Sequence, residues 1–220
     1  MNIHENIKKQ FIQNKASWIN SSKIGLTVNS KNDFIPWYCF DAINYLEKKI
    51  TNSDNIFEFG CGASTLFFFK KKCRIISLET NKKWFKAIIN LVLTNSDNIK
   101  FSPIINDNYF KFNNLEIYLI EDGLNNDEYQ NFSINIANKK NILFDYIVVD
   151  SLKRHLCCIN SLDALKTNGT IVLDDSERKN YQKTFDFFAK NNFLLHEFIG
   201  IAPAQLKLKK TSFFSKKSNV

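Results

Sequence analysis

The stretch NIFEFGCGASTLFFF, residues 55–69, decides how the rest of the chain is organised. Its apolar first part predicts a buried strand, and Gly60-Cys61-Gly62 then predicts a tight turn into a helix that begins at Ala63. A strand that runs through Gly-x-Gly into a helix lets a ligand approach bare backbone. Thr65 stands where the dinucleotide-binding fingerprint needs a third Gly or Ala, so the ligand differs from the one that this fingerprint binds.

A carboxylate, Glu58, lies two residues before the first glycine. A fixed negative charge there repels a pyrophosphate and attracts an ammonium or sulfonium group. The run Glu58-Phe59-Gly60-Cys61-Gly62 resembles the first motif of the class I S-adenosylmethionine-dependent methyltransferases, in which an acidic residue and Gly-x-Gly follow an apolar strand. The resemblance covers about residues 35–215. It implies that S-adenosylmethionine is bound by Glu58, Gly60, Cys61, Gly62 and Ser64.

A second acidic residue, Glu79, follows the next predicted strand, residues 74–78. It lies 19 residues after Gly60, close to the spacing at which a carboxylate accepts hydrogen bonds from ribose hydroxyls. A carboxylate suits this task because it offers only acceptors and both hydroxyls can donate. Taken alone, Glu79 is better explained as a solvent-exposed strand end. Together with Glu58 and the glycines, it is predicted to bind the cofactor.

Apolar runs alternate with amphipathic stretches along the rest of the chain. Residues 144–149 and 170–173 read as strands buried on both faces, and residues 193–199 and 206–214 read as two strands joined by a loop. We therefore expect an α/β fold with a Rossmann-like, doubly wound, mostly parallel sheet and a C-terminal antiparallel strand pair. The methyltransferase resemblance implies the same architecture.

The remaining segments give expectations about organisation. Residues 1–34 are predicted to form an N-terminal helix and a loop, and residues 35–220 the methyltransferase domain. Within the latter, we expect a helix from Pro36, a third strand over 99–105, and an extra edge strand or hairpin arm over 115–121.

Four predicted strands end in acidic residues, which are Glu58, Glu79, Asp150 and the pair Asp174-Asp175. Because ligands bind outside the carboxyl ends of the strands in open α/β sheets, these residues predict a shared, ligand-facing rim. We expect Asp150 to act as a catalytic base if the acceptor is a hydroxyl. Three residues nearby are candidates for an anionic substrate group or for ordinary surface positions, namely Arg154, Arg178 and Tyr181.

A metal site is an open alternative at the same edge. Asp150 and Lys153 resemble the Asp-x-x-Lys of metal-dependent catechol-type O-methyltransferases, in which an Asp-Asn pair usually follows at the next strand end. Here Asp174-Asp175 stands one position short of that pair. Asp150, Asp174 and Asp175 could hold Mg²⁺ and lower the pKa of a bound hydroxyl. The departure from the pattern favours the other explanation, in which the aspartates cap a helix and fix a loop.

Length, composition and charge limit the kind of fold, compartment and partner that we expect for this chain. The 220 residues, 44% of them hydrophobic, fit one globular domain, and the chain has neither an apolar run long enough for a membrane span nor a signal peptide. Five cysteines, an odd number without CxxC spacing, indicate a reducing cytoplasm. The net charge of +8 points weakly to nucleic acid, but the lysines are dispersed in short clusters typical of solvated faces, such as residues 207–210.

We therefore expect a cytoplasmic methyltransferase that transfers a methyl group from S-adenosylmethionine by in-line displacement to the oxygen of a small-molecule acceptor. Methylation of RNA or DNA is an alternative suggested by the basic charge, although the chain lacks an Asn-Pro-Pro-Tyr-type motif. A non-catalytic cofactor-binding protein is another. The acceptor and the oligomeric state are left open.

Overall fold

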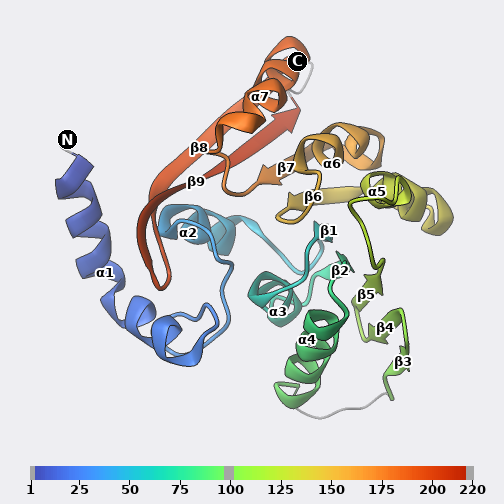
Figure 1. Ribbon diagram of the computed structural model, residues 1–220, viewed down its shortest axis with the longest axis horizontal. Helices are drawn as coiled ribbons and strands as arrows, with labels where there is room; N and C mark the ends of the chain where they lie inside the picture. Colours follow the sequence, from blue (N-terminus) through green and yellow to red (C-terminus); the bar gives the residue numbers. More distant parts are fainter. Residues whose placement is uncertain (1–2, 97–101, 217–220) are drawn as a thin grey trace.

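The computed structural model describes residues 3–96 and 102–216. Its centre is a nine-stranded sheet in the order β3-β4-β5-β2-β1-β6-β7-β9-β8 (Figure 1). The parallel strands are β1 (Asn55–Phe59), β2 (Arg74–Glu79), β5 (Leu115–Leu119), β6 (Phe144–Val149) and β7 (Leu165–Leu173). The antiparallel strands are β3 (Ile104–Asn106) and β4 (Tyr109–Phe112) at one edge, and β8 (Phe193–Ala202) and β9 (Gln205–Lys216) at the other.

Helices cover both faces of the sheet. On one face lie α2 (Phe40–Lys49), α3 (Ala63–Lys70) and α4 (Lys82–Thr94), and on the other α5 (Glu128–Lys140), α6 (Arg154–Asn160) and α7 (Gln182–Lys190), with the short 3-10 helices η1 (Leu162–Ala164) and η2 (Lys179–Tyr181) (Figure 1). The strands alternate between the two cores, so Ile56 packs toward α2–α4 while Phe57 and Phe59 pack toward α5–α7. The expected doubly wound, mostly parallel fold with a C-terminal antiparallel pair is confirmed.

The N-terminal helix α1 (Ile3–Ile24) is kinked at Asn14 and lies beside the β8–β9 hairpin. Gln10, which is buried, donates from Nε2 to Asp41 (3.0 Å) and accepts the backbone N–H of Ile201 (3.0 Å). The helix is therefore tied to both α2 and the hairpin. The division at residue 34 stays a prediction. Among the described residues, no helix has the length and apolar character needed to cross a membrane.

The position of β5 differs from the edge strand that its alternating pattern favours. It lies inside the sheet, parallel to β2 and antiparallel to β4, so the hairpin-arm alternative is the correct one. The pattern misleads because Glu116 is buried: its carboxylate pairs with Lys140 (2.8 Å) and accepts hydrogen bonds from the hydroxyls of Tyr109 and Tyr118.

Two boundaries also differ. The helix expected from Pro36 begins at Phe40, because Trp37 is held by contacts with the hairpin: its indole donates to the Pro203 carbonyl (2.9 Å) and its own carbonyl accepts from Lys209 (2.6 Å). The third strand expected over 99–105 lies partly outside the described residues, and β3 begins at Ile104.

Candidate active site

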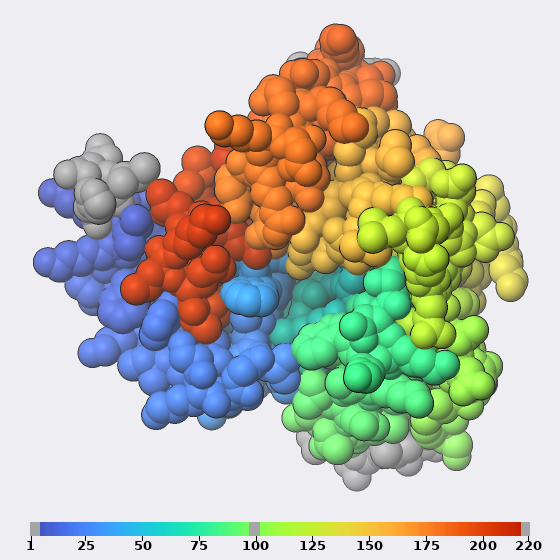
Figure 2. Space-filling view, viewed as in Figure 1, coloured from blue at the N-terminus to red at the C-terminus, as the bar shows by residue number. Residues whose placement is uncertain are grey.

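The carboxyl ends of β1, β6 and β7 face a cavity of about 850 Å³, which forms part of the hollow in the middle of the face shown in Figure 2. The Gly-x-Gly turn and Trp84 form one side, and the acidic ends of β6 and β7 form the floor. The wall is completed by Trp37, the tip of the β8–β9 hairpin, and Ser21, Ser22 and Gly25 to Thr27. Of the acidic residues predicted to form the rim, Asp150 and Asp175 border the cavity, whereas Glu58, Glu79 and Asp174 are buried and do not. Much of the wall comes from segments that the sequence did not assign to the site.

The two glycines of the turn have different roles. Gly60 has a φ of +93°, and a Cβ atom there would lie 2.8 Å from the backbone oxygen of Asp150. Only glycine fits that position. Gly62 has extended backbone, and a Cβ atom there would have the Ser64 hydroxyl, at 3.9 Å, as its nearest neighbour. Gly62 thus leaves open space beside the cavity, as close approach of a ligand to the backbone requires.

Glu58 lies beneath this turn and is fully buried. Its carboxylate accepts hydrogen bonds from the hydroxyls of Ser64, Thr65 and Ser77, and Thr65 in turn accepts the backbone N–H of Gly62 (2.9 Å). Burial raises the pKa of Glu58 to about 7, while the three hydroxyl donors act in the opposite direction. Glu58 is absent from the cavity wall, and it fixes the turn and the first residues of α3 from below. Its direct contact with the cofactor stays a prediction.

Glu79 holds the same turn from the side. One carboxylate oxygen accepts the backbone N–H groups of Thr80 (2.7 Å) and Asn81 (2.8 Å). The other accepts the backbone N–H (3.2 Å) and the thiol (3.4 Å) of Cys61. With 6% of its surface exposed, Glu79 is not the solvent-facing strand end that the sequence allowed as an alternative. Its contact with a ribose stays a prediction, and the fit is incomplete because four donors already surround the carboxylate.

Trp84, which the sequence analysis did not single out, borders the cavity from the first turn of α4. Its indole N–H donates to the carbonyl of Cys61 (2.7 Å), and 39% of the residue is exposed. The tryptophan therefore fixes the turn and offers apolar surface to a ligand. The sequence places Trp84 in the predicted helix directly after Glu79. The apolar stripe of that helix predicts only packing, so it does not mark Trp84 as a site residue.

Asp150, Asp174 and Asp175 meet on the cavity floor, with one carboxylate oxygen of each lying within 4.8 Å of the others. Asp150 and Asp175 border the cavity, whereas Asp174 is fully buried beneath it. Asp175 adopts a left-handed backbone conformation with a φ of +50°. The sequence thus grouped these three residues correctly.

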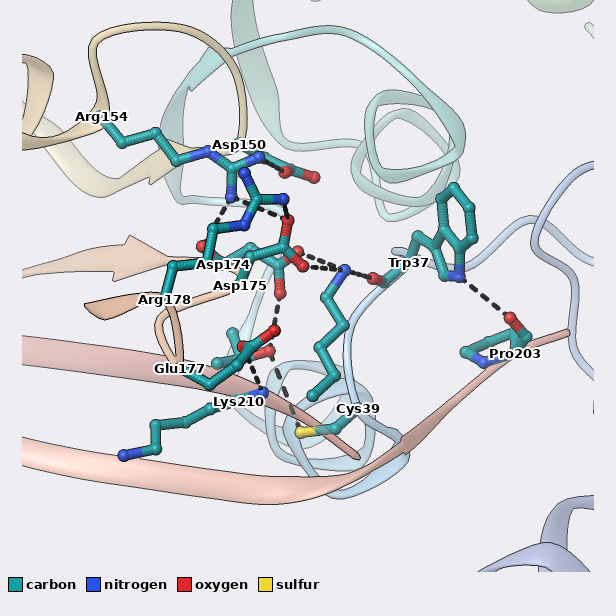
Figure 3. A network of polar contacts seen from close by, with 12 residues as sticks. Trp37, Cys39, Asp150, Arg154, Asp174, Asp175, Glu177, Arg178, Pro203 and Lys210 are labelled. Carbon is teal, nitrogen blue, oxygen red and sulfur yellow. Dashed lines mark hydrogen bonds and ion pairs between the residues drawn. The ribbon is translucent and has the colours of Figure 1, made fainter. Parts of the chain in front are cut away.

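Three cations accompany the three carboxylates, and two of them, Arg154 and Arg178, are labelled in Figure 3. Arg154 lies 2.9 Å from Asp150 and 3.5 Å from Asp175. Lys209 bridges Asp174 (2.6 Å) and Asp175 (3.0 Å). Arg178 pairs with Asp175, and its side chain is 52% exposed. Lys209, read from the sequence as part of a solvated lysine cluster, is instead buried, with 8% of its side chain exposed.

Burial and these ion pairs shift the pKa values of the three carboxyl groups on the floor. Burial and the charge of Asp150 raise the pKa of Asp174 to about 8, and Lys209 acts against this. Burial also raises the pKa of Asp150, against the effect of Arg154. Burial acts upward on Asp175 as well, but Lys209 and Arg154 outweigh it and leave the pKa of that carboxyl below its usual value.

Mg²⁺ does not fit this arrangement. The ion needs free carboxylate oxygens and several waters, whereas all three carboxylates are already paired with protein cations. Lys153, the lysine of the Asp-x-x-Lys pattern, is turned away from the cavity and donates to the carbonyl of Asn126 (3.3 Å). Tyr181 is also absent from the cavity wall and packs in the core beside α7.

No family model matches the chain, and no curated protein matches it by sequence. Solved structures do share its fold. The O-methyltransferase TomG of Streptomyces achromogenes, which is involved in tomaymycin synthesis and was solved with S-adenosylmethionine, matches with a TM-score of 0.60 and 9% identity over 99% of this chain and 100% of TomG. A Staphylococcus aureus protein, provisionally described as a caffeoyl-CoA O-methyltransferase, matches with a TM-score of 0.56 and 13% identity over 95% and 96% of the two chains.

A third structure, the precorrin-8w decarboxylase of Methanobacterium thermoautotrophicum, matches with a TM-score of 0.52 and 12% identity over 87% of this chain and 97% of the other. Identities this low show the fold alone. That fold is the one of the class I S-adenosylmethionine-dependent methyltransferases, as the glycine motif predicts.

Proposed function

We propose that this protein is an S-adenosylmethionine-dependent methyltransferase that acts on an oxygen of a small-molecule acceptor. The observation that carries the proposal is the Gly-x-Gly turn, which is fixed by two buried glutamates and faces a cavity at the carboxyl ends of the parallel strands. The shared fold supports it. A cytoplasmic location, favoured by five unpaired cysteines, belongs to the same proposal.

The turn and the start of α3 would hold the cofactor. Gly60, Cys61, Gly62 and Ser64 all border the cavity, and the exposed part of Trp84 borders it beside them. When bound, S-adenosylmethionine supplies a methyl group on a positively charged sulfur. Glu58 and Glu79 hold the turn in place through their carboxylates, and their direct contacts with the cofactor stay predictions.

The floor and the opposite wall would hold the acceptor. Asp150 borders the cavity with a raised pKa, which suits a carboxylate that takes a proton from an acceptor hydroxyl. Arg178 is half exposed there and can donate to a polar group of the acceptor. Trp37, also half exposed, offers a rigid apolar face because its indole N–H is bound to Pro203. Most of the rate would come from positioning the two reactants.

Calorimetry with S-adenosylhomocysteine tests the proposal, with NAD as the control ligand. We expect S-adenosylhomocysteine to bind and NAD not to bind. The variant Gly62→Ala places a methyl group in the open space beside the turn and should weaken binding by about tenfold or more, while changing stability by less than about 1 kcal/mol. Heat from NAD alone would overturn the proposal.

Transfer of labelled methyl groups into a fractionated cell extract then tests the acceptor class. Label in the small-molecule fraction is expected. Label in the nucleic-acid fraction would favour the alternative drawn from the basic charge. Binding without transfer into any fraction would favour a cofactor-binding protein.

A further inference from the structure

Lys209 occupies the place among the aspartates where a divalent cation would have its oxygen ligands. Its ammonium lies 2.6 Å from Asp174, 3.0 Å from Asp175 and 2.6 Å from the backbone carbonyl of Trp37. An ammonium group has three N–H donors and no acceptor, so its donors match these three oxygens in number. The side chain borders the cavity but is only 8% exposed, so solvent screens its charge weakly.

Several other oxygens of the cluster are engaged as well. Arg154 pairs with Asp150 (2.9 Å) and donates to the backbone carbonyl of Asp174 (2.6 Å), and Thr211 donates to the Asp174 carboxylate (2.8 Å). The floor thus has three carboxylates and, with Arg178, three cations from the protein itself. The protein therefore supplies one cation for each carboxyl group of the floor.

We propose that Lys209 is a built-in cation that replaces the divalent metal in this site and excludes it. To bind, a metal ion would have to displace the ammonium from three oxygens or approach two fixed positive charges, Lys209 and Arg154, at close range. Either is costly where solvent screening is weak. This inference concerns the cation only and holds whether or not the site transfers methyl groups.

The experiment uses Mn²⁺ as the probe with the intact chain. Free Mn²⁺ is followed by electron paramagnetic resonance, and thermal unfolding is recorded with and without the ion. The variant Lys209→Ala keeps all three carboxylates and removes the cation. The matched control is Lys210→Ala, because the neighbouring ammonium pairs with Glu197 (2.9 Å), which is not one of the cluster aspartates.

We expect wild type and Lys210→Ala to leave Mn²⁺ free and their melting temperatures unchanged. Lys209→Ala should bind one ion at least about tenfold more tightly than wild type and melt at a higher temperature when Mn²⁺ is present. Adding Asp150→Asn to Lys209→Ala should reduce that gain.

Two results would overturn the proposal. One is a folded Lys209→Ala protein that binds Mn²⁺ no better than wild type. The other is wild-type protein that binds one Mn²⁺ and loses it in Asp150→Asn. The second measurement needs no change at Lys209, so it decides the question even if Lys209→Ala does not fold.

Discussion

At the scale of single residues, the site depends on carboxylates that do not touch the cavity. Glu58 is fully buried and accepts three hydroxyl hydrogen bonds, and no lysine or arginine pairs with it among the ion pairs of the described residues. Hydroxyl groups can either donate or accept, so this environment tolerates a neutral side chain of the same shape. Glu58 therefore holds the turn, but its ionised form lowers the free energy of unfolding relative to its protonated form.

The variant Glu58→Gln tests this cost through pH. Because burial raises the pKa of Glu58 from 4.5 to about 7, the native state binds the proton more tightly than the unfolded state. The Glu58 contribution to the free energy of unfolding must then fall as pH rises from about 4.5 to 7. Glu58→Gln lacks this dependence, so its stability relative to wild type should improve between pH 4.5 and 8, by at most about 3 kcal/mol.

Urea denaturation of both proteins at the two pH values measures the difference. Glu47→Gln is the matched control, because Glu47 is exposed and pairs only at the surface, with Lys71 (3.1 Å). Its relative stability should not change with pH. A Glu58→Gln protein whose relative stability is the same at both pH values would contradict the burial argument.

At the scale of elements, the unit that matters is β1, the glycine turn and α3. Hydrogen bonds tie the turn to the ends of both neighbouring strands. The N–H of Gly60 donates to the carbonyl of Leu78 in β2 (2.8 Å), and the N–H of Asp150, which follows β6, donates to the carbonyl of Phe59 (3.1 Å). The ends of β2 and β6 thus fix the position of the turn relative to the sheet. A side chain at Gly60 would push against the backbone of Asp150.

We expect Gly60→Ala to lower the free energy of unfolding by about 2 to 4 kcal/mol, since alanine resists a φ of +93° and its Cβ would overlap the Asp150 carbonyl. Gly62→Ala, two residues away, should cost less than about 1 kcal/mol. Denaturant unfolding of the two variants under identical conditions makes the comparison. Equal losses would mean that the turn is not constrained by β6.

At the scale of the whole molecule, the cavity is closed by both ends of the chain. The end of α1 and the turn after it supply Ser21, Ser22 and Gly25 to Thr27, and the β8–β9 hairpin supplies its tip and Lys209. Gln10, in α1, links this helix to the hairpin by accepting the N–H of Ile201, which falls in the irregularity of the β8–β9 register between Gly200 and Ala202. The wall facing the glycine turn therefore depends on contacts between residues far apart in sequence.

Gln10→Leu tests this link. The change leaves the buried Ile201 N–H without its acceptor and should destabilise the protein by about 1 to 3 kcal/mol. Gln13→Leu, in the same helix but exposed, is the matched control and should have little effect. Chemical denaturation measures both. If Gln10→Leu unfolds at the same denaturant concentration as Gln13→Leu, α1 does not brace the hairpin.

The sequence by itself determined the glycine turn, the acidic strand ends and most of the strands and helices, although β4 was not predicted. These are local features: strands buried on both faces read as apolar runs, and a turn without side chains needs glycine where Gly60 stands. Asp150, Asp174 and Asp175 could be grouped because strands of a parallel sheet end at one edge.

Only the tertiary structure decided what neutralises those aspartates and where Glu116 and Lys209 lie. Lys209 reaches the floor because β9 runs antiparallel to β7, with Ser212 opposite Leu173, so that residues preceding this pair on β9 lie beside the residues that follow it on β7. In the sequence, Lys209 is one of several lysines in the cluster at residues 207–210, and nothing distinguishes it from the others. Its burial follows from strand register and from partners distant in the chain, and these are long-range contacts that no local pattern encodes.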